Sequence, residues 1–102
     1  MQQYPLNRPL GAQISAAITT NATTKINAGS NAVFSGLLVA TAGSAWNAAI
    51  YNGNPASGGM LLVTLGADAV GAVTSPLLAC PQGLYIETSG TTPGSLNVCY
   101  YS

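Results

Sequence analysis

The sequence predicts an all-β protein: an antiparallel β-sandwich or jelly roll of about eight short strands, preceded by an extended N-terminal arm. Runs of apolar, β-branched and aromatic residues recur roughly every ten residues, and clusters of Gly, Pro, Asn and Ser separate them. No segment has the spacing of a strong amphipathic helix, which argues against a parallel α/β sheet. No fixed-period repeat indicates a solenoid or propeller. We therefore expect an arm over residues 1–12 and a single sandwich domain over residues 13–102.

The arm contains residues suited to an interface. Pro5 and Pro9 bias the residues before them toward extended backbone. Four larger side chains at alternate positions would face the same way on an extended chain: Tyr4, Leu6, Arg8 and Leu10. Tyr and Arg are enriched in interfaces, so we expect this arm to dock on a neighbouring subunit. A frayed terminus is the alternative.

The segment after the arm is ambiguous between helix and strand. Ile14, Ala17 and Ile18 continue a helical spacing from Leu10, whereas the Ile-Thr-Thr run that ends at Thr20 favours a strand. The interpretation preferred here is two strands joined by a turn, the first within 13–20 and the second within 23–28. The turn at 21–22 is not the ideal Asn-Gly.

The stretch Asn31–Gly59 is the predicted centre of the core. Its two apolar runs, Val33–Ala42 and Ala45–Tyr51, are separated by a short Gly-Ser break and are typical of two strands of a hairpin. A wide loop rich in turn formers, Asn52–Gly59, then leads into a strand over Met60–Leu65. We expect the outer strands to pack around this central hairpin.

The next segments are less regular. Gly66–Ala72 is typical of a loop, in which Asp68 is expected to cap a single helical turn. Val73–Cys80 contains Pro76 and is followed by another proline, so it is predicted to be an edge strand or irregular.

The C-terminal segment predicts a second hairpin. Gly83–Thr88 and Ser95–Tyr101 both alternate apolar and polar residues, and the loop Ser89–Gly94 joins them. Its core face is predicted to hold Leu84, Ile86, Leu96, Val98 and Tyr100. Its outer face is predicted to hold Tyr85, Glu87, Cys99 and Tyr101. Tyr85, Glu87 and Tyr101 on that face form a second predicted interface.

Charge is the most informative feature of the composition. Only Arg8, Lys25, Asp68 and Glu87 carry charge, 4% of the residues and a net charge of zero, against about 25% in an ordinary domain. Such a surface does little to keep copies of the protein apart. Two basic residues exclude a nucleic-acid partner, because counterion release needs several. A hydrophobic fraction of 48% argues against disorder, and no apolar run has the length of a membrane span.

Catalytic and metal-binding patterns are missing from the sequence. The chain has no histidine, and Asp68 and Glu87 lie far apart in sequence. Neither Cys80 nor Cys99 has an evident base to activate it, so we expect no enzymatic activity, no cofactor and no metal. Both cysteines are expected to be free thiols that pack as small apolar residues, with a disulfide as the alternative.

The aromatic residues allow two interpretations. Trp46, Tyr51 and the pair Tyr100-Tyr101 would suit a sugar-stacking platform on a sandwich face. Packing in the core and in interfaces is the interpretation favoured here, because aromatic side chains bury a large area in either role.

Two passages resemble a known class of protein. The first is Phe34-Ser-Gly-Leu-Leu-Val-Ala-Thr-Ala-Gly followed by Trp46-Asn-Ala-Ala-Ile-Tyr-Asn-Gly. The second is Cys80-Pro-Gln-Gly-Leu-Tyr-Ile-Glu-Thr-Ser-Gly, ending in Ser95-Leu-Asn-Val-Cys-Tyr-Tyr. Over roughly residues 30–102 the chain resembles small virion proteins of tailed bacteriophages, namely head decoration or cement proteins and head-fibre proteins. The resemblance implies a β-sandwich, often trimeric, bound outside the icosahedral capsid at junctions between coat-protein hexamers.

The expected function is therefore that of a capsid decoration or cement protein that bridges coat subunits and stabilises the head. Its partners would be copies of itself and the major capsid protein, with no nucleic acid and no membrane. Its location would be the virion, after assembly in the host cytoplasm. A tail or fibre component and a carbohydrate-binding sandwich module are the alternatives, and an enzyme ranks last.

Overall fold

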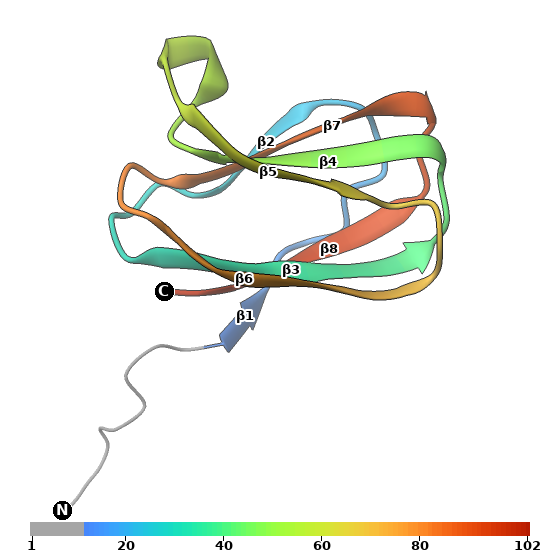
Figure 1. Cartoon of the computed structure of the whole chain (residues 1–102), viewed down its shortest axis with the longest axis horizontal. Coiled ribbons are helices and arrows are strands. Elements are labelled where there is room, and N and C mark those ends of the chain that lie inside the picture. The colour runs from blue at the N-terminus through green and yellow to red at the C-terminus, as the bar shows by residue number, and fades with distance from the viewer. Residues whose placement is uncertain (1–11) are drawn as a thin grey trace, which may run out of the picture.

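The computed structural model describes residues 12–102, which form two antiparallel four-stranded sheets packed face to face (Figure 1). The strands are β1 (Ala12–Ile14), β2 (Thr23–Asn27), β3 (Ala32–Thr41), β4 (Ser44–Asn52), β5 (Met60–Gly66), β6 (Gly71–Cys80), β7 (Leu84–Thr92) and β8 (Ser95–Tyr101). One sheet has the order β1-β8-β3-β6 and the other β2-β7-β4-β5. The predicted all-β sandwich of eight strands is thus confirmed.

The pairing of strands is nested. β4 pairs with β5, β3 with β6, β2 with β7 and β1 with β8, all antiparallel. Only β4 and β5 are consecutive strands of one sheet, and every other connection crosses between the sheets. This is the arrangement of an eight-stranded jelly roll.

The predicted central hairpin is wrong in its pairing. β3 and β4 match the predicted runs, but they lie in opposite sheets. The chain crosses between them at Ala42 and Gly43, where Gly43 N donates to Ala67 O at 3.0 Å. The hairpin that does form joins β4 to β5, and its loop contains a 3₁₀ turn over Pro55–Ser57. Alternation is the same in a hairpin and in a crossing between sheets, so it predicts the core face but not the partner strand.

The predicted C-terminal hairpin is wrong for the same reason, because β7 and β8 lie in opposite sheets. β7 also extends to Thr92, through most of the predicted loop, which leaves Pro93 and Gly94 as the connection. The predicted core face is confirmed for the residues that are fully buried, namely Leu84, Ile86, Leu96 and Val98. Tyr100 is half-buried and packs against that core.

The N-terminal strands and the Gly66–Ala72 loop also differ from expectation. β1 and β2 lie in different sheets, and the segment 15–22 crosses between them. Ile18 anchors this crossing through paired hydrogen bonds with Leu96, at 2.7 and 3.1 Å. No helical turn forms around Asp68; its Oδ1 instead accepts a hydrogen bond from Trp46 N at 2.7 Å. The predicted edge strand is confirmed as β6, and Pro76 lies where its register against β3 shifts.

The core lies between the sheets and draws alternate residues from both. Its largest fully buried side chains are Trp46, Phe34, Leu37, Ile50, Leu84, Ile86, Leu96, Val98 and Cys80. Trp46 is 0% exposed, and its indole Nε1 donates to Asn21 Oδ1 at 2.8 Å. The buried polar Thr88 donates its hydroxyl to Thr20 O at 2.6 Å. These buried polar groups are therefore hydrogen-bonded, as a stable core requires.

Candidate assembly face

The outer face of the β1-β8-β3-β6 sheet is assigned by alternation from its buried residues. Val98 points into the core, so Asn97 and Cys99 point outward from β8. On β3 Phe34 is buried, so Val33 points outward. The strand register then extends this assignment to the two edge strands.

Apolar residues run across this face from one edge to the other. One row crosses all four strands, with Ala12 opposite Tyr101, Tyr101 opposite Val33 and Val33 opposite Ala79. A second row places Ile14 opposite Cys99, and a third places Leu38 between Asn97 and Ala72. We call this surface the neutral face; it consists of Ala12, Ile14, Val33, Leu38, Ala72, Ala79, Asn97, Cys99 and Tyr101.

The neutral face exposes large apolar groups and no charge. Ile14 is 61% exposed and Leu38 is 39% exposed. Cys99 is a free thiol, and burial raises its pKa above the ordinary value of 9.0, so it stays protonated at neutral pH. The face can therefore make apolar contacts without desolvating a charge.

A hollow of about 260 Å³ lies at the β1 end of this face. Ile14, Cys99 and Tyr101 are among the residues that line it. Two polar side chains of its lining are paired within the chain: Ser35 Oγ donates to Cys99 O at 3.0 Å, and Gln13 Nε2 donates to Ser102 Oγ at 2.7 Å. With Ala12 and Ile14 also in the lining, the hollow offers contact surface to an apolar side chain.

The opposite outer face, on the β2-β7-β4-β5 sheet, has a different character. Lys25, Tyr85, Tyr51 and Leu61 form one row across its four strands. Glu87 lies in the neighbouring row, and Tyr51 OH donates to its Oε1 at a long 3.4 Å. We call this the polar face, because Lys25 and Glu87, the charged residues of the described strands, both lie on it.

The predicted outer-face interface is therefore divided. Tyr85 and Glu87 lie on the polar face, whereas Tyr101 lies on the neutral face on the other side of the molecule. The sequence places them together only if β7 and β8 form a hairpin, and they do not. The predicted interface residues of the arm, Tyr4, Leu6, Arg8 and Leu10, lie outside the described residues 12–102.

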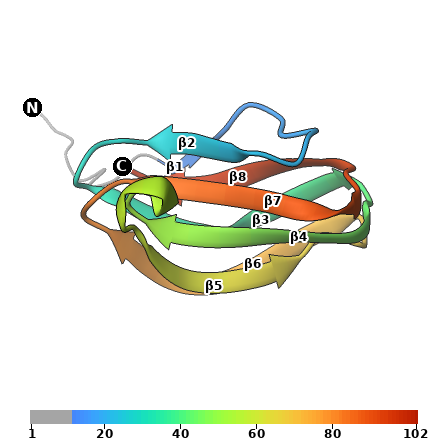
Figure 2. The same cartoon turned by 90° about the horizontal axis from the view of Figure 1, so that it is seen from above.

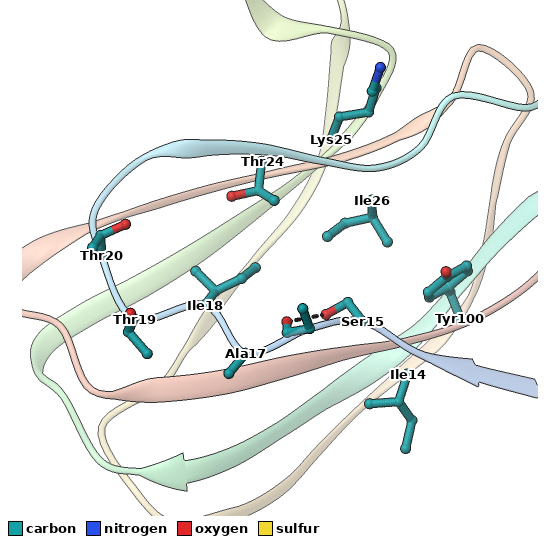
Figure 3. Close-up of a pocket in the computed structure, with 11 residues that line it drawn as sticks. Ile14, Ser15, Ala17, Ile18, Thr19, Thr20, Thr24, Lys25, Ile26 and Tyr100 are labelled. Carbon is teal, nitrogen blue, oxygen red and sulfur yellow. Dashed lines mark hydrogen bonds between the residues drawn. The ribbon is translucent and has the colours of Figure 1, made fainter.

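A larger groove of about 400 Å³ opens where the 15–22 segment crosses between the sheets (Figure 3). Ile18, Ile26 and Tyr100 supply apolar surface, and Thr24 adds a hydroxyl. Lys25 also lines the groove, but Figure 3 shows its ammonium group pointing away from the isoleucines. The sequence does not predict this groove. The groove forms where the chain crosses between the sheets, and the alternation of apolar and polar residues does not distinguish such a crossing from a hairpin.

The groove has few titratable groups. Its lining contains no carboxylate, histidine or cysteine; Lys25 and Tyr100 are its titratable residues, and the Lys25 ammonium group points away from the isoleucines. Over residues 12–102, no group of three or more His, Cys, Asp or Glu is placed to hold a metal ion. The described part of the chain also contains no helix long and apolar enough to cross a membrane.

Trp46 cannot serve as a sugar-stacking platform, because it is fully buried; here the packing interpretation is confirmed. Cys80 and Cys99 are both free, which confirms the favoured interpretation of the thiols. Comparison of the chain with protein-family models, with curated proteins and with solved structures finds no match.

Proposed function

We propose that the protein is a non-enzymatic structural building block that packs its neutral face against neighbouring subunits of a larger assembly. One observation carries the proposal. The neutral face spans four strands without a charged residue and exposes Ile14 and Leu38, whereas Lys25 and Glu87 lie on the opposite face. This difference between the faces favours one solvated side and one side in contact with a partner.

Burial and charge both favour contact through the neutral face. Removing apolar surface from water stabilises a contact by roughly 25 cal/mol per Å², and exposed apolar patches commonly mark interaction sites. With a net charge of zero, copies of the chain do not repel one another. On a symmetric lattice, many weak contacts of this kind add up through avidity.

Within this class we propose the role of a phage-head decoration or cement protein, which binds the outside of the capsid and bridges coat subunits. The two quoted passages support this role by their resemblance to such proteins. The jelly roll is compatible with it, since this architecture occurs in viral capsid domains, although a fold alone does not establish a function. A trimer would be the expected oligomer, and a tail or fibre position is the alternative within the same class.

The test uses purified heads of the encoding phage that lack this protein, mixed with added protein and sedimented. Leu38→Lys places a charge on the neutral face, and we expect the bound fraction to fall at least about tenfold, because an unpaired charge opposes burial. Val70→Lys is the comparison variant, since Val70 is apolar and 69% exposed but lies in the loop before β6, outside the residues that define the neutral face. Equal binding of Leu38→Lys and the unmodified protein would overturn the proposal.

Antibody labelling of intact virions separates the positions within the class. Label on the head exterior supports decoration, label on the tail supports the fibre alternative, and unlabelled virions contradict both.

A carbohydrate-binding function is the second candidate, and one feature of the polar face favours it. Tyr51 and Tyr85 are half-buried and lie directly opposite each other on adjacent strands, with Lys25 and Glu87 beside them. Aromatic faces with neighbouring polar groups suit sugar rings. A glycan-array signal that Tyr85→Ala abolishes would support this candidate, and a blank array would count against it.

A further inference from the structure

The four edges of the two sheets differ in how they are protected against pairing with another strand. β1 has only three residues, β2 has five and carries Lys25, and β6 contains Pro76 beside a register shift. Short length, an edge lysine, proline and bulges are the devices that prevent edge-to-edge association. Each of these three edges thus has at least one strong device.

The fourth edge, β5, is different. It is a seven-residue strand, Met-Leu-Leu-Val-Thr-Leu-Gly, with neither a charged residue nor a proline. Leu62 forms a bulge against β4, but Val63–Gly66 pairs regularly. Within residues 12–102, no strand pairs with the outer edge of β5, so that edge presents unpaired backbone N–H and C=O groups. Figure 2 shows β5 along the outer, lower side of the sandwich in that view.

The side chains of β5 are also incompletely covered. Met60 is 64% exposed and Leu61 is 51% exposed. Val63 and Leu65 are paired with the buried Ile50 and Ala48 and so point toward the core, yet both remain only half-buried. A further strand beside β5 would cover these side chains and would pair the free backbone groups in the same step.

We propose that β5 pairs antiparallel with β5 of a second copy of this chain, so that the two β2-β7-β4-β5 sheets form one continuous eight-stranded sheet. A second copy fits this edge because the free N–H and C=O groups of β5 can pair with those of an identical strand, and β5 carries no charge that would repel it. With a net charge of zero and no charge on β5, two copies approach without repulsion. The contact is separate from the neutral face and does not depend on the proposed function.

The register of this pair follows from the alternation of side chains. Opposite residues in an antiparallel pair share a face, so a two-fold axis through the regular segment must pass at a residue. An axis at Thr64 places Thr64 opposite Thr64 of the second copy and Val63 opposite Leu65 of the second copy. Opposed threonines are a favourable cross-strand pair, and both inward-facing apolar residues gain cover. In this register the position of Asp68 faces that of Met60 of the second copy, so the two Asp68 carboxylates do not face each other.

Cysteine cross-linking tests the register. Thr64→Cys and Thr23→Cys are each made in the full chain. Both variants also carry Cys99→Ser, which removes the accessible native thiol, whereas Cys80 is fully buried and can stay. Thr23 is the matched control, because it is an exposed threonine on the opposite edge of the same sheet. Oxidised glutathione is the oxidant; each intermolecular disulfide formed reduces one molecule of it to two of glutathione. Directly opposite residues have Cα atoms about 4.5–5.5 Å apart, within the range that a disulfide spans.

We expect Thr64→Cys to give about tenfold more covalent dimer than Thr23→Cys, because a paired strand holds the two thiols at a high effective concentration. Equal cross-linking of the two variants would overturn the proposal. Amide hydrogen exchange on the unmodified protein is the second measurement: exchange of Val63–Gly66 should slow as protein concentration rises, and exchange independent of concentration contradicts pairing between copies. Adding Leu38→Lys should leave the cross-link intact, so failure of the neutral-face proposal is distinguishable from failure of this one.

Discussion

Asp68→Ala is expected to destabilise the fold even though Asp68 is an exposed loop residue. Trp46 pairs with Gly90 of β7, but its carbonyl accepts from Ala67 N at 2.8 Å, so its backbone polar groups point to the β5 side. β5 stops pairing with β4 at the Asn47–Gly66 pair, so no residue of β5 accepts from the Trp46 N–H. Asp68 Oδ1 accepts a hydrogen bond from that N–H at 2.7 Å. Trp46 itself is fully buried, so the donor that loses its acceptor belongs to a residue of the core.

The magnitude follows from this geometry. A buried donor left without its acceptor costs about 1–3 kcal/mol, with the upper part of the range for charged acceptors. For a domain of this size, a loss of about 2 kcal/mol lowers Tm by roughly 8–16 °C. Asp68→Asn keeps an acceptor oxygen at the same position and should recover most of the loss.

The assay is urea and thermal unfolding followed by circular dichroism, with Glu87→Ala as the control. That variant makes the same change of charge, but Glu87 has only the long 3.4 Å contact with Tyr51, so its effect should stay below about 0.5 kcal/mol. If Asp68→Ala destabilises the protein no more than Glu87→Ala does, the assigned role of Asp68 is refuted.

Further predictions concern the core, a close approach between strands and the thiols. Trp46 fluorescence should be blue-shifted and resist quenching by iodide, because the side chain is 0% exposed; red-shifted, readily quenched emission would contradict the core packing. Gly90→Ala should destabilise the fold by about 2 kcal/mol or more, since a Cβ there would collide with the carbonyl oxygen of Ala45 in β4. Gly58→Ala should cost only about 1 kcal/mol, because its Cβ would meet nothing within 4 Å and only the left-handed backbone, with φ +88°, opposes a side chain there. Equal urea midpoints would refute the distinction. Burial raises the pKa of Cys80 and Cys99 above the ordinary 9.0, and for Cys80 this outweighs the lowering by a backbone hydrogen bond from Phe34. The stability that the protonated thiols contribute is therefore complete below the unfolded-state pKa of about 9 and is lost as pH rises through the raised folded-state pKa. Urea midpoints measured between about pH 8 and 10.5 should fall with pH, and they should fall less for Cys99→Ser than for the wild type.

The sequence predicts the core of this protein better than its topology. Phe34 and Ile86 lie in strands whose alternation identifies the inward residues, and Pro76 correctly places β6 at an edge. Alternation does not reveal which strand pairs with which, because a hairpin and a crossing between sheets have the same period. The predicted central and C-terminal hairpins, and the predicted turn between the two N-terminal strands, failed for that reason.

The candidate surfaces depend on that topology, so the sequence predicts them only in part. The scarcity of charge indicates a contact surface, but Tyr101 and Tyr85 are assigned to opposite faces only once β8 and β7 are placed in different sheets. Asp68 is a suitable cap by residue type. Its actual partner, Trp46, lies 22 residues away in sequence and becomes its neighbour only through the fold.

The central claim is that the neutral face holds the chain against its neighbours. Size-exclusion chromatography with light scattering tests it most directly on the isolated chain, over a range of protein concentrations for the unmodified protein, Leu38→Lys and Val70→Lys. We expect self-association of the unmodified protein and of Val70→Lys, with a shift to smaller species for Leu38→Lys. A monomer at every concentration, or association that Leu38→Lys leaves unchanged, would contradict it.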